Sequence, residues 1–219
     1  MIVAHMHPGG PGLAAPSASI VLVRVLVDAL ERAGISRDEL LRGAHFDASH
    51  LEDASVRVPL DEFEDLQARA VALLRDEALG LRMAECTESS FDLFAPLVAH
   101  APTLREAMGL CAQFGRLLKE GTNVTLREQG DTAAIRLHFT RVSPLSDRVN
   151  AEFALAGLFR LMRGFAGTNA PADTVEFEHP RPAYHREHAR IFQGAERFSQ
   201  PSTGITFASA LLDRAHLHL

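Results

Sequence analysis

Apolar and polar residues recur at helical spacing through the first part of the chain. In the segment from 17 to 33, apolar residues cover most sides of a predicted helix. Its polar strip is narrow and consists of Arg24, Asp28 and Arg32. We therefore predict that this helix is buried, either in the core or in a contact between subunits. Another helix is predicted after Pro59, because acidic residues fill its first turn and suit the positive end of the helix dipole.

The pattern changes near the middle of the chain. A helix with a capping box at its start is predicted over residues 103–120. Alternation in "NVTLREQGDTAAIRLHF" then predicts a β-hairpin that turns at Gly130 and Asp131. A long helix follows over residues 145–165, and the pieces "TVEFEH", "ERFSQ" and "GITFAS" are strand-like. Helices followed by grouped strands predict an α+β fold, in which N-terminal helices pack with a small antiparallel sheet covered by two long helices.

The same pattern suggests how the chain is divided. Residues 1–16 are rich in Pro and Gly and show no period, which predicts a flexible tail. Residues 17–219 are long enough for one domain with a full core. Within it we expect a helical subregion over 17–80 and an α+β subregion over 81–219.

Composition narrows the class of protein. The 219 residues carry a formal net charge of -6, so the chain lacks the excess of basic residues with which proteins neutralise nucleic-acid phosphates. Cys86 and Cys111 show neither CxxC spacing nor a secreted framework, which indicates reduced structural thiols. The run from Ile20 to Val27 is too short to span a membrane, and no signal peptide is recognisable. We therefore expect a cytoplasmic protein without a membrane partner.

The segment "VDALERAGISRDELLRG", residues 27–43, has the outline of a helix-turn-helix. A recognition helix presents polar and basic side chains to the DNA groove. Here the second helix offers only Arg37 and Arg42 against Asp38 and Glu39. Ordinary helix packing is the better interpretation.

Three histidines stand out in "HPRPAYHREHARIF": His179, His185 and His188. On a helix His185 and His188 share a face, and such pairs can bind zinc. The stretch lacks the spacing of known zinc-binding helices, and His179 approaches through a proline-rich segment whose geometry the sequence does not define. We expect no metal site, and a connector whose histidines lie on its outer face. Its anchoring residues would be Tyr184, Ile191 and Phe192.

The motifs of known enzymes are also missing. The sequence has no GxSxG elbow, no phosphate-binding glycine loop and no GxGxxG after a strand. We therefore predict that the chain is not an enzyme and has no catalytic residues and no cofactor. A His-dependent metal enzyme remains the third hypothesis.

A small-molecule pocket is the remaining candidate site. Several aromatic residues should point into the space between the sheet and the helices at 103–120 and 145–165, with polar groups such as Asn150 and Glu152 close by. The candidate ligand-binding residues are Phe114, Arg116, His138, Phe153, Phe159 and Phe177. A solid core with a polar rim is the alternative.

Two longer stretches carry a family resemblance. The stretch "APTLREAMGLCAQFGRLLKEGTNVTLREQGDTAAIRLHF" resembles the arabinose-binding-type N-terminal domain in one branch of the AraC-family transcription regulators, and "FQGAERFSQPSTGITFASALLDR" resembles the closing pattern of that branch. The helices "VPLDEFEDLQARAV" and "AEFALAGLFRLMRGFAG" match it as well. The resemblance extends over about residues 17–219.

The resemblance implies a bacterial regulator whose N-terminal domain senses an effector or holds a homodimer. Its DNA contacts would belong to a C-terminal domain with two helix-turn-helix motifs, which is absent from this chain. The helix-rich pattern does not supply the cupin-type barrel of the arabinose sensor itself, so no sugar-contact residue can be carried over. The resemblance implies an unknown small-molecule effector, with a ligand-free dimerisation module as the alternative, and leaves open whether the protein activates or represses.

Overall fold

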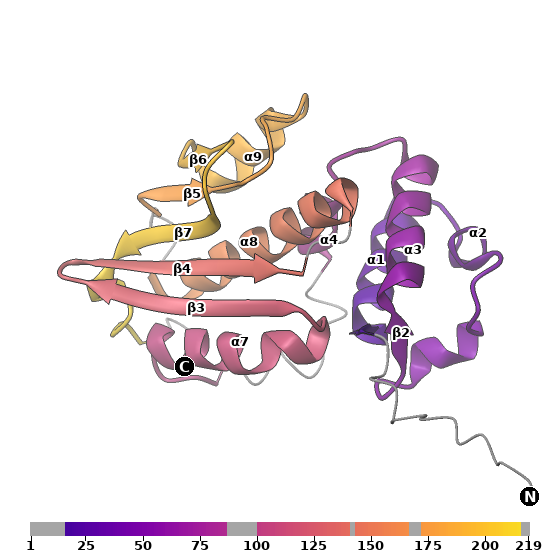
Figure 1. Ribbon diagram of the computed structural model, residues 1–219, viewed down its shortest axis with the longest axis horizontal. Helices are drawn as coiled ribbons and strands as arrows, with labels where there is room; N and C mark the ends of the chain where they lie inside the picture. Colours follow the sequence, from indigo (N-terminus) through magenta and orange to yellow (C-terminus); the bar gives the residue numbers. More distant parts are fainter. Residues whose placement is uncertain (1–15, 87–99, 141–142, 167–171, 216–219) are drawn as a thin grey trace, which may run out of the picture.

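The structure is a computed structural model that describes residues 16–86, 100–140, 143–166 and 172–215. Nearly all of the predicted tail lies outside these ranges. The helices at one end of the molecule are α1 (Ile20–Arg32), α2 (Arg37–Leu41), α3 (Leu60–Leu74) and α4 (Leu79–Glu85), with the 3-10 helix η1 (Ala48–Glu52) between α2 and α3. Figure 1 shows α1, α2 and α3 beside one end of the larger sheet.

The first predicted helix is confirmed but begins three residues later than expected. Residues Ser17–Ser19 form strand β1, which pairs antiparallel with β2 (Arg57–Pro59). Helix α1 begins after Ser19 because the Ser19 side chain accepts a hydrogen bond from the backbone N–H of Val21 and caps the helix. Eight of its residues are buried, and it packs against α3 and α4 of the same chain. The burial predicted from its apolar pattern is therefore core packing.

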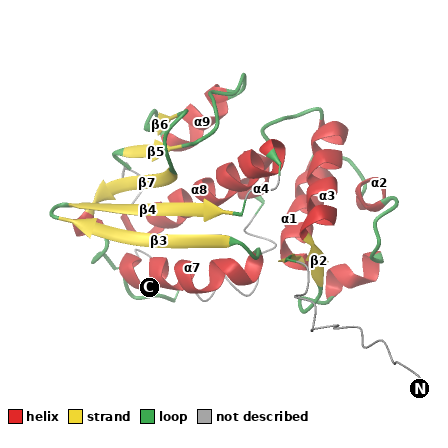
Figure 2. Cartoon of the chain, in the orientation of Figure 1, coloured by secondary structure: helices red, strands yellow, loops and turns green. Residues whose placement is uncertain are grey.

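The larger sheet has the strand order β3-β4-β7-β5-β6. Its strands are β3 (Thr122–Gln129), β4 (Thr132–Phe139), β5 (Thr174–Glu176), β6 (Glu196–Arg197) and β7 (Thr203–Ala208). The predicted hairpin is confirmed, with Gln129 paired to Thr132 across the two-residue turn, where Gly130 has a φ of 59°. The sheet is antiparallel except at one edge, where β5 and β6 are parallel and are connected through α9 (His185–Phe192). The expected all-antiparallel sheet thus becomes a mixed one (Figure 2), because a helix lies between these two strands.

Two long helices cover one face of this sheet, as the sequence predicts. They are α7 (Leu104–Leu118) and α8 (Pro144–Ala166), and both run along the strands in Figure 1. Alternation along β4 turns Ile135 and Leu137 toward them, and both residues are almost fully buried. The 3-10 helix η2 (Ser209–Leu211) follows β7. Among the described helices, none is both long and apolar enough to cross a membrane.

Helix α8 contributes to two hydrophobic cores. Its Val149 belongs to the core of the N-terminal helices, whereas Leu155 and Phe159 belong to the core under the sheet. The contact with α3 contains a closed hydrogen-bond network of three buried polar side chains. In it, Gln67 donates to Asn150 Oδ1 at 3.0 Å, Ser146 donates to Gln67 Oε1 at 2.7 Å, and Asn150 donates to Ser146 Oγ at 3.0 Å.

Lys119 follows α7 and lies near α3 and α8, whose Glu64 and Asp147 act on its charge. It is the only lysine in the sequence, yet it is just 4% exposed, and its Nζ atom has no hydrogen-bond partner in the described part of the chain. Its backbone bridges to Ala18. Burial lowers the pKa of Lys119 from its usual 10.5, and the carboxylates of Glu64 and Asp147 oppose this shift.

Candidate functional site

The six residues predicted to bind a ligand do not converge on one place. Arg116 is exposed near the end of α7, and Phe114 on the same helix is half-buried. His138 is exposed because alternation along β4 turns it to the face opposite Ile135 and Leu137. Three of the predicted residues therefore do not line an interior space together.

The other three lie on or near α8. Phe153 is half-buried and packs against both cores. Phe159 and Phe177 are buried in the core under the sheet, where both contact Phe192, with ring centroids 5.4 and 5.6 Å away. The space proposed for the ligand, between α7, α8 and the sheet, is occupied by this core. Its buried side chains include Leu104, Met108, Cys111, Ile135, Leu137, Leu155, Phe159 and Met162.

A pocket of about 210 Å³ lies instead between α4, α8 and α9. Its apolar lining consists of Leu81, Ala84, Ala156, Phe159 and Ile191. Its charged lining consists of Glu85, Arg160, Arg163 and Arg190. Of the six predicted residues, Phe159 alone lines this pocket.

The three arginines of the pocket differ in how their guanidinium groups are bonded. Arg160 donates to the carbonyl of Ala84 at 2.7 Å, and Arg190 pairs with the carboxylate of Glu85. Within the described ranges, no ion pair involves Arg163. Because a guanidinium has five N–H donors and matches a carboxylate in shape, this wall is suited to an anionic group.

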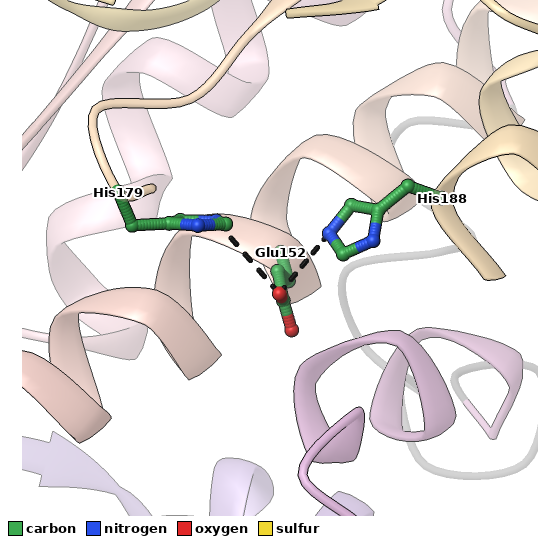
Figure 3. A group of neighbouring side chains, drawn as sticks. All are labelled: Glu152, His179 and His188. Atoms are coloured by element: carbon green, nitrogen blue, oxygen red, sulfur yellow. Dashed lines mark ion pairs between the residues drawn. The ribbon is translucent and has the colours of Figure 1, made fainter. Parts of the chain in front are cut away.

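A second cluster lies close to the pocket and has members on α8, on α9 and in the segment after β5. The carboxylate of Glu152 on α8 faces the imidazoles of His179, which follows β5, and of His188 on α9 (Figure 3). Glu152 Oε1 is 3.1 Å from His188 Nε2 and 3.7 Å from His179 Nε2. The side chains of Glu152 and His188 are fully buried, and that of His179 is 13% exposed. Among the described residues, this is the group of His, Cys, Asp and Glu side chains that could hold a metal ion.

The surroundings of the cluster define the roles of its nitrogen and oxygen atoms. His179 Nδ1 lies 2.9 Å from the carbonyl oxygen of Pro180, to which it can only donate, so a neutral His179 leaves Nε2 as an acceptor. Burial lowers the pKa of His179 below its usual 6.5 and favours that neutral form. Tyr184 donates its hydroxyl to Glu152 Oε1 at 2.8 Å, and burial, followed by the Glu152 charge, raises the pKa of Tyr184.

Aromatic rings close the cluster on the other side. The His188 ring lies 5.2 Å from Phe177, 5.0 Å from Phe198 and 5.5 Å from Tyr184, measured between centroids. Phe177 also contacts Phe192, which contacts the pocket residue Phe159. A continuous aromatic path therefore joins the cluster to the pocket.

The prediction that the histidines lie on the outer face of a connector is wrong for His179 and His188. Helix α9 is present as expected, but it presents His188 and Phe192, one turn apart, to the interior. His185 is partly exposed and outside the cluster, whereas His179 keeps a small exposed fraction although it faces Glu152. The predicted anchoring role is in keeping with the full burial of Phe192 and the half-burial of Tyr184 and Ile191.

The pairing of Glu152 with these histidines was missed, although the sequence contained one signal for it. Glu152 interrupts the apolar face of "AEFALAGLF", and an acidic residue at a buried helix position normally has a partner. The partners are 27 and 36 positions away, so only the fold identifies them.

Comparison of the sequence with known protein families gives one match over most of the chain. The model of the arabinose-binding domain of AraC transcription regulators, N-terminal, matches residues 34–215. The chain is 24% identical, over 196 residues, to the ornithine utilization regulator of Pseudomonas aeruginosa. That match covers 89% of this chain and 58% of the regulator.

A solved structure shares the fold. The crystal structure of the transcriptional regulator CdpR from Pseudomonas aeruginosa superposes with a TM-score of 0.64 at 14% identity, over 90% of this chain and 57% of that one. The chain thus spans less than two thirds of the length of either relative. Because the family model matches most of its residues, the chain belongs to the family of the arabinose-binding N-terminal domain of AraC transcription regulators.

Proposed function

We propose that the chain is the effector-sensing and oligomerisation part of a bacterial, cytoplasmic transcription regulator, and that it acts by binding rather than by catalysis. Membership of the family and the two relatives, both transcription regulators, support this role. DNA would be bound by a helix-turn-helix domain outside this chain, in keeping with the net charge of -6. An effector would shift the balance between DNA-binding states of the whole protein.

The observation that carries the proposal is the pocket between α4, α8 and α9. It combines an apolar wall, which includes Phe159 and Ile191, with the guanidinium groups of Arg160, Arg163 and Arg190. Its volume of about 210 Å³ is small for a ligand pocket, which points to a small effector. The effector class that fits is a molecule with a carboxylate on a short apolar body.

A matched ligand series tests this effector class. Hexanoate is expected to raise the melting temperature of the chain, whereas hexanamide and hexylamine, which lack the carboxylate, are not. A ligand present at 100 times its Kd raises the free energy of unfolding by about 2.7 kcal/mol, which raises the melting temperature of a chain of this size by roughly 5–10 °C. Ornithine forms a fourth arm, because one relative is named for its utilization.

Arginine variants locate the binding site. Arg163→Gln should weaken hexanoate binding by about 10-fold or more, the effect of losing a charged hydrogen bond. Arg127→Gln is the control, since Arg127 is exposed on β3, away from the pocket. Equal effects of the two substitutions, or equal stabilisation by hexanoate and hexanamide, would refute the carboxylate pocket.

Self-association belongs to the same proposal, although α1 does not offer the surface for it, because its apolar residues are already buried within the chain. Helix α7 does expose Leu117, which is 57% exposed and is the large hydrophobic side chain most open to solvent in the described part of the chain. Light scattering with and without hexanoate would show whether association accompanies effector binding.

A further inference from the structure

Two imidazole nitrogens and a carboxylate oxygen meet at the spacing of metal ligands. The ligating atoms of Glu152, His179 and His188 all lie within 4.8 Å of one another, and the separations from Glu152 Oε1 to the Nε2 atoms of His188 and His179 are 3.1 and 3.7 Å. Ligands about 2.0–2.2 Å from a tetrahedral ion lie roughly 3.3–3.6 Å apart. The observed separations bracket that range, so an ion could enter with small side-chain adjustments.

The polar atoms of the cluster are not satisfied by protein groups alone. His179 Nε2, both ring nitrogens of His188 and Glu152 Oε2 are buried and have no hydrogen-bond partner among the described residues. Because His179 Nδ1 faces the Pro180 carbonyl, the lone pair on Nε2 is turned toward an electron-rich carboxylate. Buried polar groups without partners are costly, and a cation between these atoms would remove the cost.

We propose that Glu152, His179 and His188 bind one divalent transition-metal ion of the Zn²⁺ type, with a fourth coordination position left open. Two imidazoles and one carboxylate are a ligand set that zinc accepts, whereas Mg²⁺ and Ca²⁺ prefer oxygen ligands. The site is separate from the arginine-lined pocket and does not depend on the function proposed for that pocket.

Neighbouring residues provide the supports that metal ligands usually have. The Pro180 carbonyl fixes the ring orientation of His179, and the Tyr184 hydroxyl orients the Glu152 carboxylate. Phe177 and Phe198 shield His188 from water. A bound ion would fasten α9 and the segment after β5 to α8, where Glu152 lies.

Metal titration of the chelator-treated chain tests the site. One equivalent of Zn²⁺ should bind and raise the melting temperature, and Co²⁺ should give the visible absorption of a tetrahedral nitrogen and oxygen site. Millimolar Mg²⁺ should do neither. His179→Gln and Glu152→Gln should each weaken Zn²⁺ binding by at least about 100-fold, since the loss of an outer partner alone costs 10- to 100-fold.

The matched control is His185→Gln, because His185 lies on α9 with His188 but outside the cluster. Histidines at the two ends of the sequence, His5, His7, His216 and His218, are present in every variant, so their contribution cancels. Circular dichroism and the metal-free melting temperature establish that each variant is folded, and His179→Gln, at the edge of the cluster, carries the test if Glu152→Gln unfolds. The proposal is overturned if the folded parent binds no Zn²⁺, or if His185→Gln weakens binding as much as His179→Gln.

Discussion

Gly80 is the residue at which α4 comes closest to α8. A Cβ atom placed on it would lie 2.8 Å from Glu152 Cβ and still closer to the Val149 carbonyl oxygen. Because that oxygen belongs to a helix backbone, it cannot swing aside as a flexible side chain would. Glycine at this position therefore keeps α4 against the turn of α8 that carries Glu152.

Gly80→Ala is expected to lower the free energy of unfolding by about 1–3 kcal/mol, the usual effect of overpacking. Urea denaturation measures it. Gly109→Ala on α7 is the control, because its new Cβ would meet nothing within 4 Å, and a gain of about 0.5–1 kcal/mol is expected from the helix propensity of alanine. If both substitutions stabilise the chain, the close approach of α4 and α8 is wrong.

At the residue scale, the sequence shows which side chains could bind or react, but it does not show which of them the fold buries or what they contact. The spacing of His185 and His188 correctly places them on a helix, but it does not say which side of that helix faces the core. His188 is inside because α9 packs on α8, a contact that no local pattern records. The pocket was missed for the same reason, since its lining comes from three helices far apart in the sequence.

At the element scale, the contact of α3 with α8 depends on the network of Gln67, Ser146 and Asn150. Ser146→Ala would leave Gln67 Oε1 without its donor and Asn150 Nδ2 without its acceptor in a buried site. The expected loss is about 1–3 kcal/mol in the free energy of unfolding, measured in urea.

A double-mutant cycle gives this prediction a control. Once Gln67→Met has removed the amide, Ser146→Ala should cost markedly less, because one of the two orphaned groups is already gone. Fully additive losses would mean that the three side chains do not act as a network.

For elements with long, regular patterns the bounds could be predicted, whereas for the short strands β5 and β6 the sequence indicates their presence but not their pairing. Helix α8 and the β3–β4 hairpin lie within a residue or two of their expected bounds, because periodicity and turn chemistry agree there. Strands β5 and β6 have three and two residues, too few to show a period, and their parallel pairing depends on the packing of α9.

At the scale of the whole molecule, α8 contributes residues to both hydrophobic cores, to the cluster of Glu152, His179 and His188, and to the pocket. Its Val149 lies in the N-terminal core, its Glu152 in the histidine cluster, and Phe159 and Arg163 in the pocket. A small shift of α8 on effector binding would therefore reach both cores at once, which is the kind of contiguous contact through which sites are coupled.

Lys119 makes the free energy of unfolding depend on pH in the alkaline range. Its pKa is lower in the folded chain than the 10.5 of an unfolded chain. Between these two pKa values the unfolded chain binds more protons than the folded chain, so stability rises with pH. Below the folded pKa this contribution is lost, because an ammonium must then be kept buried.

Lys119→Met removes this dependence, and we expect the variant to be at least as stable as the parent at pH 7. Urea denaturation of both proteins at pH 7 and pH 10 should show the parent gaining on the variant as the pH rises. The single tyrosine, whose pKa is raised in the folded chain, also contributes to the pH dependence, but it is common to both proteins and cancels. Parallel pH profiles of parent and variant would contradict the prediction.

The burial of this lysine also determines how the chain reacts with amine-directed reagents. Succinimidyl dyes and amine cross-linkers normally find many lysines on a protein surface, whereas here the one lysine side chain is inside the fold. Modification of Lys119 would therefore mark chains that have opened, which makes the residue a built-in reporter of unfolding.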